Sequence, residues 1–288
     1  MHAKARSRSQ VLPSRSTKAR DMPLLDDIVR IARDAGNAIL EVYRSGDFGA
    51  TLKDDRSPLT LADCRAHDVI AAELGALAPE TPLLSEESES VDAATRRAWE
   101  RFWLVDPLDG TKEFLRRNDE FTVNIALIER GRAVLGVVHA PALGVTYAAA
   151  EGEGAWRTDL AGTTQVHASD YRRDGLRVVA SRSHAGAVLP RLLERLGNPP
   201  CVSRGSSLKL CLVADGAANL YPRLGPTMEW DIAAAACIVA EAGGTLTDLA
   251  GEPLAFNKPD LHNPEFVVCG DPPYPWRAAL ESVRAEAG

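Results

Sequence analysis

Apolar positions recur at helical spacing near the start of the chain. Between Pro23 and Tyr43 the pattern predicts an amphipathic helix, whose apolar positions are Leu25, Ile28, Val29, Ala32, Ile39 and Val42. The polar stretch KDDRSP interrupts this pattern. A second helix is predicted from Ala62 to Leu77, and the prolines at 79 and 82 end it.

The middle of the chain changes to the short apolar runs that are typical of β-strands. TPLLS and FWLVD predict two buried strands, with a helix over residues 92–101 between them. FTVNIALI, AVLGVVHAP and VTYAAAEG predict a set of antiparallel strands, with Gly131 and Gly144 in the turns.

Beyond about residue 165, short strands alternate with helices. RVVAS, ANLYP, TLTD and EFVVCG predict strands, while residues 186–196 and SLKLCLVADG predict helices. The clearest element is an alanine-rich helix from Trp230 that Gly243 and Gly244 close. The pattern predicts a mixed α/β protein with an N-terminal half at 22–165, a C-terminal half at 166–288, and no obvious linker between them.

Composition narrows the class of protein. The 288 residues are 45% hydrophobic and 25% charged, which is ordinary for a soluble globular chain. No apolar run approaches the roughly 20 residues that span a bilayer. The net charge of −7 argues against nonspecific nucleic-acid binding. The five cysteines show no CxxC spacing, which favours reduced thiols in a cytoplasmic protein over a structural zinc site.

The first residues differ from the rest in charge. Residues 1–20 carry six Lys and Arg side chains and no acid, so the remainder has a net charge of −7 − 6 = −13. Residues 1–21 are predicted to be a disordered basic tail, because nothing in them could offset the entropy of ordering. They lack the apolar stretch of a signal peptide. A weak peripheral contact with anionic lipid stays open as an alternative role.

Two aspartates lie three residues apart in the segment WLVDPLDGTKEF, where the apolar run ends. Asp106 and Asp109 are expected at the carboxyl end of a strand, where open α/β sheets commonly place ligands. Nearby carboxylates raise each other's pKa unless a cation lies between them. Gly110 lets the backbone approach a ligand, and TKEFL can begin a helix whose free N–H groups favour an anion. The segment thus suits a metal ion and a phosphate, although an Asp-rich turn alone would give the same pattern.

Other acids occupy similar positions. Glu86 and Glu87 close the TPLLS strand, and Asp63 opens the second helix. Asp231 begins the alanine-rich helix, where capping alone would also explain it. Mg²⁺ prefers carboxylate oxygens and keeps waters and substrate phosphate among its ligands, so these acids favour a magnesium site.

The chain resembles the lithium-sensitive, magnesium-dependent phosphatases of the inositol monophosphatase superfamily. The resemblance rests on SEES at 85–88, WLVDPLDGTKEF at 103–114 and EWDIAAAACIVAEAGG at 229–244, and it extends from about Leu25 to Asp271. GTKEF in particular is similar to the nucleotidase branch. The resemblance implies an α/β (α+β) fold, built as a layered αβαβα sandwich of the inositol monophosphatase and sugar phosphatase type.

The resemblance also implies a role for each matching acid, with two or three Mg²⁺ ions per site. Glu86, Asp106 and the carbonyl of Leu108 match the ligands of one ion, and Asp106, Asp109 and Asp231 match those of a second. Asp63 matches the acid that holds a further ion and, with Thr111, orients the attacking water. Asp63, Thr111 and Glu86 are therefore the expected catalytic residues.

The resemblance also implies a set of substrate-binding residues, and three of them have an alternative role. By resemblance they are Glu86, Leu108, Asp109, Gly110, Thr111, His184, Ser206, Lys209, Arg223 and Asp231. His184 could instead be a surface histidine, Lys209 a solvated helix charge, and Arg223 the partner of a surface acid. Inositol monophosphatases carry a glutamate near the position of Arg223. A guanidinium cannot accept a hydroxyl proton, but it can bind a phosphate in a bidentate manner.

The resemblance implies an enzyme that removes the 3′-phosphate of adenosine 3′,5′-bisphosphate and yields AMP in sulfur assimilation. An inositol monophosphatase or sugar bisphosphatase with the same metal site is the nearest alternative. A nucleotide-binding regulator on the same scaffold is a second one. The residues of the predicted water-activating pair, Asp63 and Thr111, favour an enzyme. The sequence leaves the oligomeric state undetermined.

Overall fold

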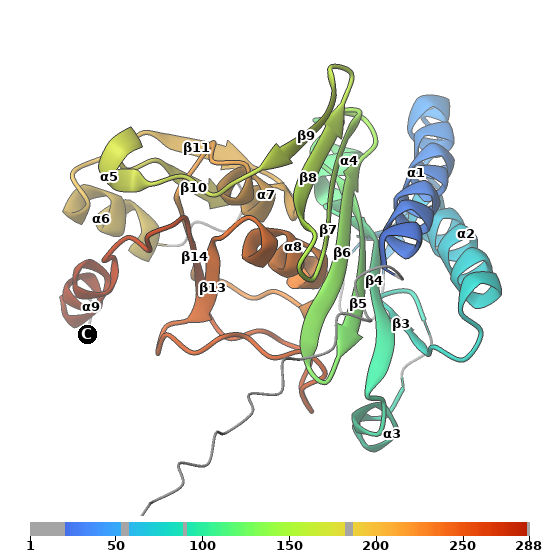
Figure 1. Ribbon diagram of the computed structural model, residues 1–288. Coiled ribbons are helices and arrows are strands. Elements are labelled where there is room, and N and C mark those ends of the chain that lie inside the picture. Colours follow the sequence, from blue (N-terminus) through green and yellow to red (C-terminus); the bar gives the residue numbers. More distant parts are fainter. Residues whose placement is uncertain (1–20, 53–57, 89–90, 182–186, 287–288) are drawn as a thin grey trace, which may run out of the picture.

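The computed structural model describes residues 21–52, 58–88, 91–181 and 187–286 (Figure 1). The predicted basic tail, except for Asp21, lies outside these residues, and so does His184. The helices are α1 (Asp21–Ser45), α2 (Leu61–Leu77), α3 (Ala93–Arg97), α4 (Thr111–Leu115), α5 (Tyr171–Asp174), α6 (Val188–Arg195), α7 (Leu208–Ala214), α8 (Glu229–Glu241) and α9 (Arg277–Ala285).

A large sheet forms the centre of the first half of the chain. Its seven strands lie in the order β3-β4-β5-β6-β7-β8-β9. β3 and β4 are parallel, and every later neighbour is antiparallel. The strands are β3 (Leu83–Ser85), β4 (Arg101–Asp109), β5 (Thr122–Glu129), β6 (Arg132–Ala140), β7 (Val145–Ala150), β8 (Gly154–Asp159) and β9 (Gly162–Val166).

A smaller sheet forms the second half, and a two-stranded one lies near the start. The smaller sheet has the order β11-β10-β12-β14-β13. Its strands are β10 (Val178–Ser181), β11 (Cys201–Arg204), β12 (Leu220–Arg223), β13 (Thr245–Asp248) and β14 (Phe266–Cys269). The two-stranded sheet pairs β1 (Thr51–Leu52) with β2 (Pro58–Leu59).

Alternation along the central strands produces two apolar faces, and helices cover both. Trp103 and Val105 of β4 pack with α1 and α2, whereas Phe102 and Leu104 pack with α7 and α8. The far side of the smaller sheet packs on α6 and α9. The layers therefore run helix, sheet, helix, sheet, helix, as Figure 1 shows. This confirms the predicted αβαβα sandwich.

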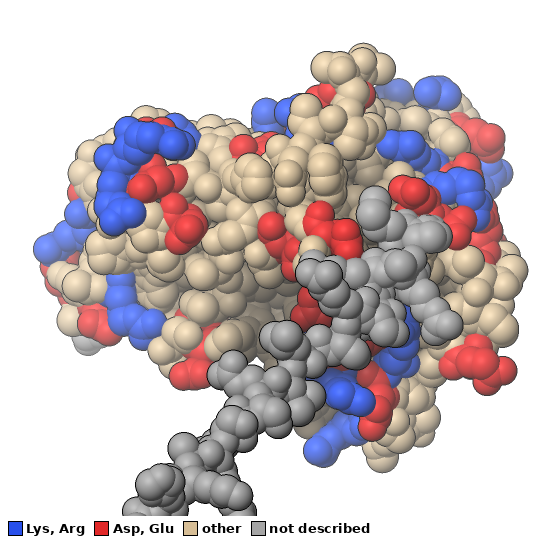
Figure 2. Space-filling model, viewed as in Figure 1, with Lys and Arg blue, Asp and Glu red and all other residues tan. Residues whose placement is uncertain are grey.

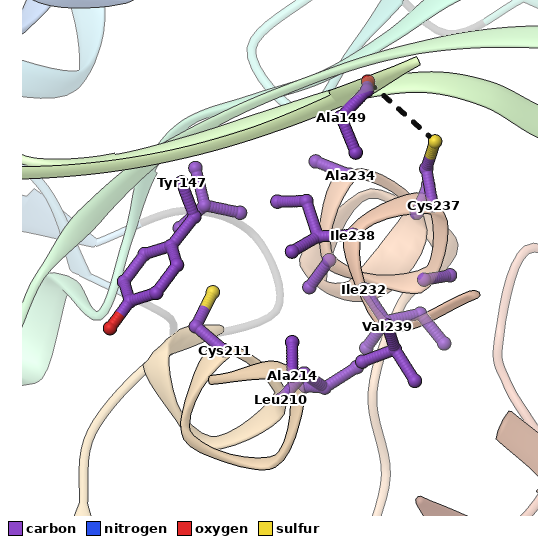
Figure 3. Packing of buried hydrophobic residues seen from close by; sticks show 14 of the residues in the cluster. Tyr147, Ala149, Leu210, Cys211, Ala214, Ile232, Ala234, Cys237, Ile238 and Val239 are labelled. Carbon is purple, nitrogen blue, oxygen red and sulfur yellow. Dashed lines mark hydrogen bonds between the residues drawn. The ribbon is translucent and has the colours of Figure 1, made fainter. Parts of the chain in front are cut away.

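The shared middle layer is closely packed. Figure 3 shows Tyr147 of β7 above α7, and Cys237 of α8 directed at the backbone of β7, where its Sγ lies 3.7 Å from the Ala149 carbonyl oxygen. The alanine-rich face of α8 allows this approach. A side chain at Gly136 of β6 would meet the Ala234 carbonyl oxygen at 2.1 Å, so only glycine fits there. Because α8 touches the large sheet so closely, its first turn has a fixed position relative to the end of β4.

Several elements of the structure were not predicted from the sequence, namely β1, β2, β8, β9, β11, α5 and α9. The hairpin of β8 and β9 was missed because it is mostly exposed and lacks an apolar alternation. α9 was also missed, although Trp276, Leu280 and Val283 are buried at helical spacing. The predicted helix over 92–101 is shorter in the structure and spans Ala93–Arg97.

The surface carries charges of both signs (Figure 2), and the cysteines are reduced thiols, as the composition predicted. On the face in Figure 2, acidic and basic side chains are interspersed. At the protein surface, Arg172 forms a salt bridge with Asp170, and Arg173 with Asp174. All five cysteines lie in described segments and none forms a disulfide. Cys64 and Cys201 are exposed, and the other three cysteines are buried. In the described segments no helix combines the length and apolar character needed to cross a bilayer.

Candidate active site

The site begins where β4 ends. The pairing of β4 with β5 shifts register between Asp106, which is buried, and Asp109, which ends the strand. Gly110 then turns the chain with a φ of 92° into α4. A side chain at Gly110 would lie 3.2 Å from the Glu120 carbonyl oxygen, which together with the positive φ explains the glycine.

Asp63 is fixed in the first turn of α2 by its own helix cap. Its Oδ2 accepts hydrogen bonds from the Thr60 amide at 2.7 Å and from the Thr60 hydroxyl at 2.6 Å. Its Oδ1 accepts one from the Thr111 hydroxyl at 3.3 Å. The predicted pair of Asp63 and Thr111 is therefore in contact across 48 residues of sequence.

Asp231 and Glu86 come from two further elements. Asp231 lies in the first turn of α8, where its Oδ2 accepts a hydrogen bond from the Met228 amide at 2.9 Å. Asp231 therefore caps α8, but the cap uses only one of its two carboxylate oxygens. Glu86 follows β3, and its amide donates to the Val105 carbonyl at 3.1 Å, which holds it beside β4.

One pocket of about 280 Å³ joins these residues. Nearly all of the predicted metal and substrate residues line it: Glu86, Asp106, Leu108, Asp109, Gly110, Thr111, Ser206, Lys209, Arg223 and Asp231. Asp63 lies directly behind Thr111. The tertiary structure thus brings together residues from both halves of the chain.

The carboxylates of the pocket repel one another. Burial raises the pKa of Asp106 well above its ordinary value, and the charges of Glu86, Asp109 and Asp231 raise it further. Burial and then Asp109 raise the pKa of Asp231 to about 8. Burial likewise raises the pKa of Asp63 to about 6. A cation between these acids would lower the raised pKa values of Asp106 and Asp231 and favour their ionised forms near neutral pH.

Two buried cations occupy the same pocket. Lys209 is 6% exposed and its Nζ donates to the Ser206 carbonyl at 2.5 Å. Burial lowers the pKa of Lys209 to about 8, although Asp109 opposes this shift. Arg223 is 7% exposed and donates to the carbonyls of Gly225 at 3.2 Å and Pro226 at 2.6 Å. Neither has a salt bridge within the described residues, so the alternative in which Arg223 pairs with a surface acid finds no support.

The acids offer suitable oxygen ligands for Mg²⁺. Asp106 and Asp109 each accept a backbone hydrogen bond at one oxygen, from the Leu108 amide at 3.0 Å and the Ser207 amide at 2.6 Å. The second oxygens of Asp106, Asp109 and Asp231 have no hydrogen-bond donor in the described part of the chain. Hard oxygen donors of this kind fit Mg²⁺. Among the described residues, no group of three or more His, Cys, Asp or Glu side chains has the geometry to hold a metal ion. The assignment of ligands therefore stays a proposal.

Several lining residues were not predicted. Lys112, Glu113, Arg204, Tyr221 and Thr227 also face the pocket. Lys112 and Glu113 belong to the GTKEF motif, which could have indicated them. Arg204, Tyr221 and Thr227 stand in segments without any recognisable motif, so only the fold shows their position.

The fold and this site define a member of the inositol monophosphatase family, whose model matches residues 22–283. The chain belongs to that family. It is 48% identical over 247 residues to the 3′(2′),5′-bisphosphate nucleotidase CysQ of Escherichia coli, covering 85% of this chain and 99% of that protein. It is 38% identical to CysQ of Aggregatibacter actinomycetemcomitans, covering 90% and 97% of the two chains.

Solved structures give the same placement. The crystal structure of CysQ from Bacteroides thetaiotaomicron superimposes with a TM-score of 0.77 at 40% identity, covering 88% of this chain and 98% of that chain. An IMPase from Thermotoga maritima superimposes with a TM-score of 0.76 at 25% identity, covering 93% and 100%. The higher identity to the CysQ structure agrees with the nucleotidase character of the GTKEF motif.

Proposed function

We propose that this protein is a phosphomonoesterase that hydrolyses the 3′-phosphate of adenosine 3′,5′-bisphosphate to AMP and phosphate. One observation carries the proposal: a single pocket holds a group of mutually repelling acids together with two buried cations. The acids suit a metal-assisted reaction at one phosphate. The cations suit a second phosphate that does not react. A nucleotide bisphosphate has both.

The acidic part of the pocket would hold two or three Mg²⁺ ions. Glu86, Asp106, Asp109, Asp231 and the Leu108 carbonyl are the proposed ligands, with Asp63 for a further ion. Bound Mg²⁺ supplies a polarised water and neutralises charge on the leaving oxygen. The protein contributes carboxylates that the fold has already desolvated, so their interaction with a bound cation is strong.

Thr111 and Asp63 orient and deprotonate the attacking water. The Thr111 hydroxyl donates to Asp63 Oδ1, so its lone pairs are free to accept a proton from a water in the pocket. As the Thr111 oxygen takes a proton from the water, the hydroxyl proton of Thr111 passes to Asp63 Oδ1. The second oxygen of Asp63 is fixed by Thr60, which keeps Oδ1 directed at Thr111.

Lys209 and Arg223 bind the phosphate that is not hydrolysed. The guanidinium of Arg223 has more N–H donors than its two carbonyl partners use, so donors remain for a phosphate. Those carbonyls fix the guanidinium plane, and a fixed plane favours bidentate binding. Ser206 and Gly110 line the space between the two phosphate positions in this proposal.

Phosphate release from a panel of substrates tests the proposal. With Mg²⁺, adenosine 3′,5′-bisphosphate should be hydrolysed with a higher kcat/KM than inositol 1-phosphate, fructose 1,6-bisphosphate or AMP. An equal or higher value for inositol 1-phosphate would replace the proposal by the inositol monophosphatase alternative. Binding of the bisphosphate without any release of phosphate would favour the regulator. Cytoplasmic location, a role in sulfur assimilation, and a weak contact of the basic tail with anionic lipid stay predictions.

A further inference from the structure

Glu113 differs from the other buried charged residues that line the pocket. It lines the pocket, is only 9% exposed, and its side chain has no hydrogen bond or salt bridge within the described residues. By contrast, Asp109, Asp231 and Lys209 each have a hydrogen-bond partner. The Glu113 carboxylate oxygens are not enclosed by the described residues and remain accessible from the pocket. They can therefore accept a hydrogen bond from a bound ligand.

Glu113 lies near an acid and a cation of the pocket. Its charge acts on both the Asp109 carboxylate and the Lys209 ammonium. Its side chain lies against Gly205, where an added Cβ would meet the Glu113 Cγ at 2.7 Å. Next to Gly205, the Ser206 hydroxyl oxygen is buried and also has no partner in the described residues. Two polar side chains without a hydrogen-bond partner in the described residues thus belong to the same part of the pocket, beside Gly205.

The chemistry of a carboxylate limits what it can bind here. It only accepts hydrogen bonds when ionised, and it repels phosphate, so neither phosphate of the substrate can be its partner. If one phosphate is held by the acids and the other by Lys209 and Arg223, the ribose lies between them. The ribose of adenosine 3′,5′-bisphosphate carries one free hydroxyl, at C2′, beside the phosphate that is cleaved.

We propose that the Glu113 carboxylate accepts a hydrogen bond from the ribose 2′-hydroxyl and thereby selects ribonucleotide over deoxyribonucleotide bisphosphates. This inference rests on the proposed function and adds a specificity-determining residue to it. The 6-amino group of adenine is the other neutral donor on the substrate. It is attached to the base, away from the two phosphates, so it is the less suitable partner for a residue whose charge acts on both Asp109 and Lys209.

Three substrates separate these possibilities. We would measure kcat/KM for adenosine 3′,5′-bisphosphate, its 2′-deoxy analogue and its inosine analogue with wild type, Glu113→Ala and Glu113→Gln. The wild type should prefer the ribonucleotide over the deoxy analogue by roughly 10- to 100-fold, the value of a hydrogen bond to a charged group. Glu113→Ala should reduce this ratio to near unity, and Glu113→Gln should give an intermediate ratio because its carbonyl still accepts.

The deoxy analogue also reports on folding. Its kcat/KM should change little in Glu113→Ala, whereas a damaged pocket would lower the rates of all substrates together. Glu120→Gln is the matched control, since Glu120 is a neighbouring buried carboxylate that accepts from the Gly205 amide at 2.8 Å. That variant should lower both rates by a similar factor and preserve their ratio.

Other results would overturn the inference. A wild-type ratio near unity, or an equal loss on both substrates in Glu113→Ala and Glu113→Gln, would exclude the 2′-hydroxyl contact. Loss of discrimination against the inosine analogue alone would assign Glu113 to the adenine amino group instead. Failure of the proposed function has a different signature, because the wild type would then not hydrolyse adenosine 3′,5′-bisphosphate preferentially in the substrate panel.

Discussion

Replacing Asp231 by asparagine should stabilise the metal-free protein while it impairs the enzyme. In the metal-free state, burial and the charge of Asp109 raise the pKa of Asp231 to about 8, from an ordinary value of 3.8. The folded protein therefore holds this proton more tightly than the unfolded chain does. It follows that the metal-free protein loses stability as the pH rises from about 4 through about 8.

The size of the effect follows from the pKa shift. At about 1.4 kcal/mol per pKa unit, the shift corresponds to up to about 5 kcal/mol of lost stability at pH 8. With roughly 2 °C per kcal/mol for a chain of this size, Asp231→Asn should raise the Tm of the metal-free protein by up to about 10 °C. Asparagine keeps an oxygen for the Met228 amide, so the cap of α8 survives.

Thermal unfolding in a chelating buffer at pH 5 and pH 8 measures this effect. The stabilisation by Asp231→Asn should be large at pH 8 and small at pH 5, where Asp231 is already protonated. Added Mg²⁺ should raise the Tm of the wild type more than that of the variant, and the variant should lose most of its turnover. Glu281 is an exposed carboxylate on α9, so Glu281→Gln is the control and should change neither the Tm nor the turnover. A lower Tm for metal-free Asp231→Asn at pH 8 would show that the acids do not repel one another as described.

The remaining predictions concern catalysis and substrate choice. Asp106→Asn should reduce kcat by more than about tenfold, and a smaller loss, under about 1.4 kcal/mol, would contradict its assignment as a shared metal ligand. Thr111→Ala should lower kcat but preserve the Mg²⁺ dependence of the Tm; a lost dependence would make its role structural. Arg223→Ala should lower kcat/KM for the bisphosphate by about 10- to 100-fold and hardly affect adenosine 3′-monophosphate, and an equal loss on both would exclude a contact with the second phosphate. Lithium should inhibit turnover, and complete insensitivity would be unexpected for this family.

Local sequence determined the elements and the residues that end them. The alternation of FTVNIALI and the alanine-rich run after Trp230 are local patterns, and the structure has β5 and α8 there. The acids could be recognised for the same reason, because Asp63 and Asp231 lie in first turns of helices, and Asp106 and Asp109 lie at a strand end. Local periodicity failed for β8 and β9, since an exposed hairpin has no apolar face to mark it.

Only the tertiary structure decided which of these residues share a pocket and what their charges do. Asp109 meets the Ser207 amide across 98 residues of sequence, and Arg223 reaches the same pocket from the end of β12. The raised pKa values of Asp63 and Asp231 and the lowered pKa of Lys209 arise from burial, which depends on the packing of both sheets around α7 and α8. Glu113 stands in a motif that is visible in the sequence. Its lack of a partner is visible only in the fold, because hydrogen bonding and desolvation depend on neighbours that are distant along the chain.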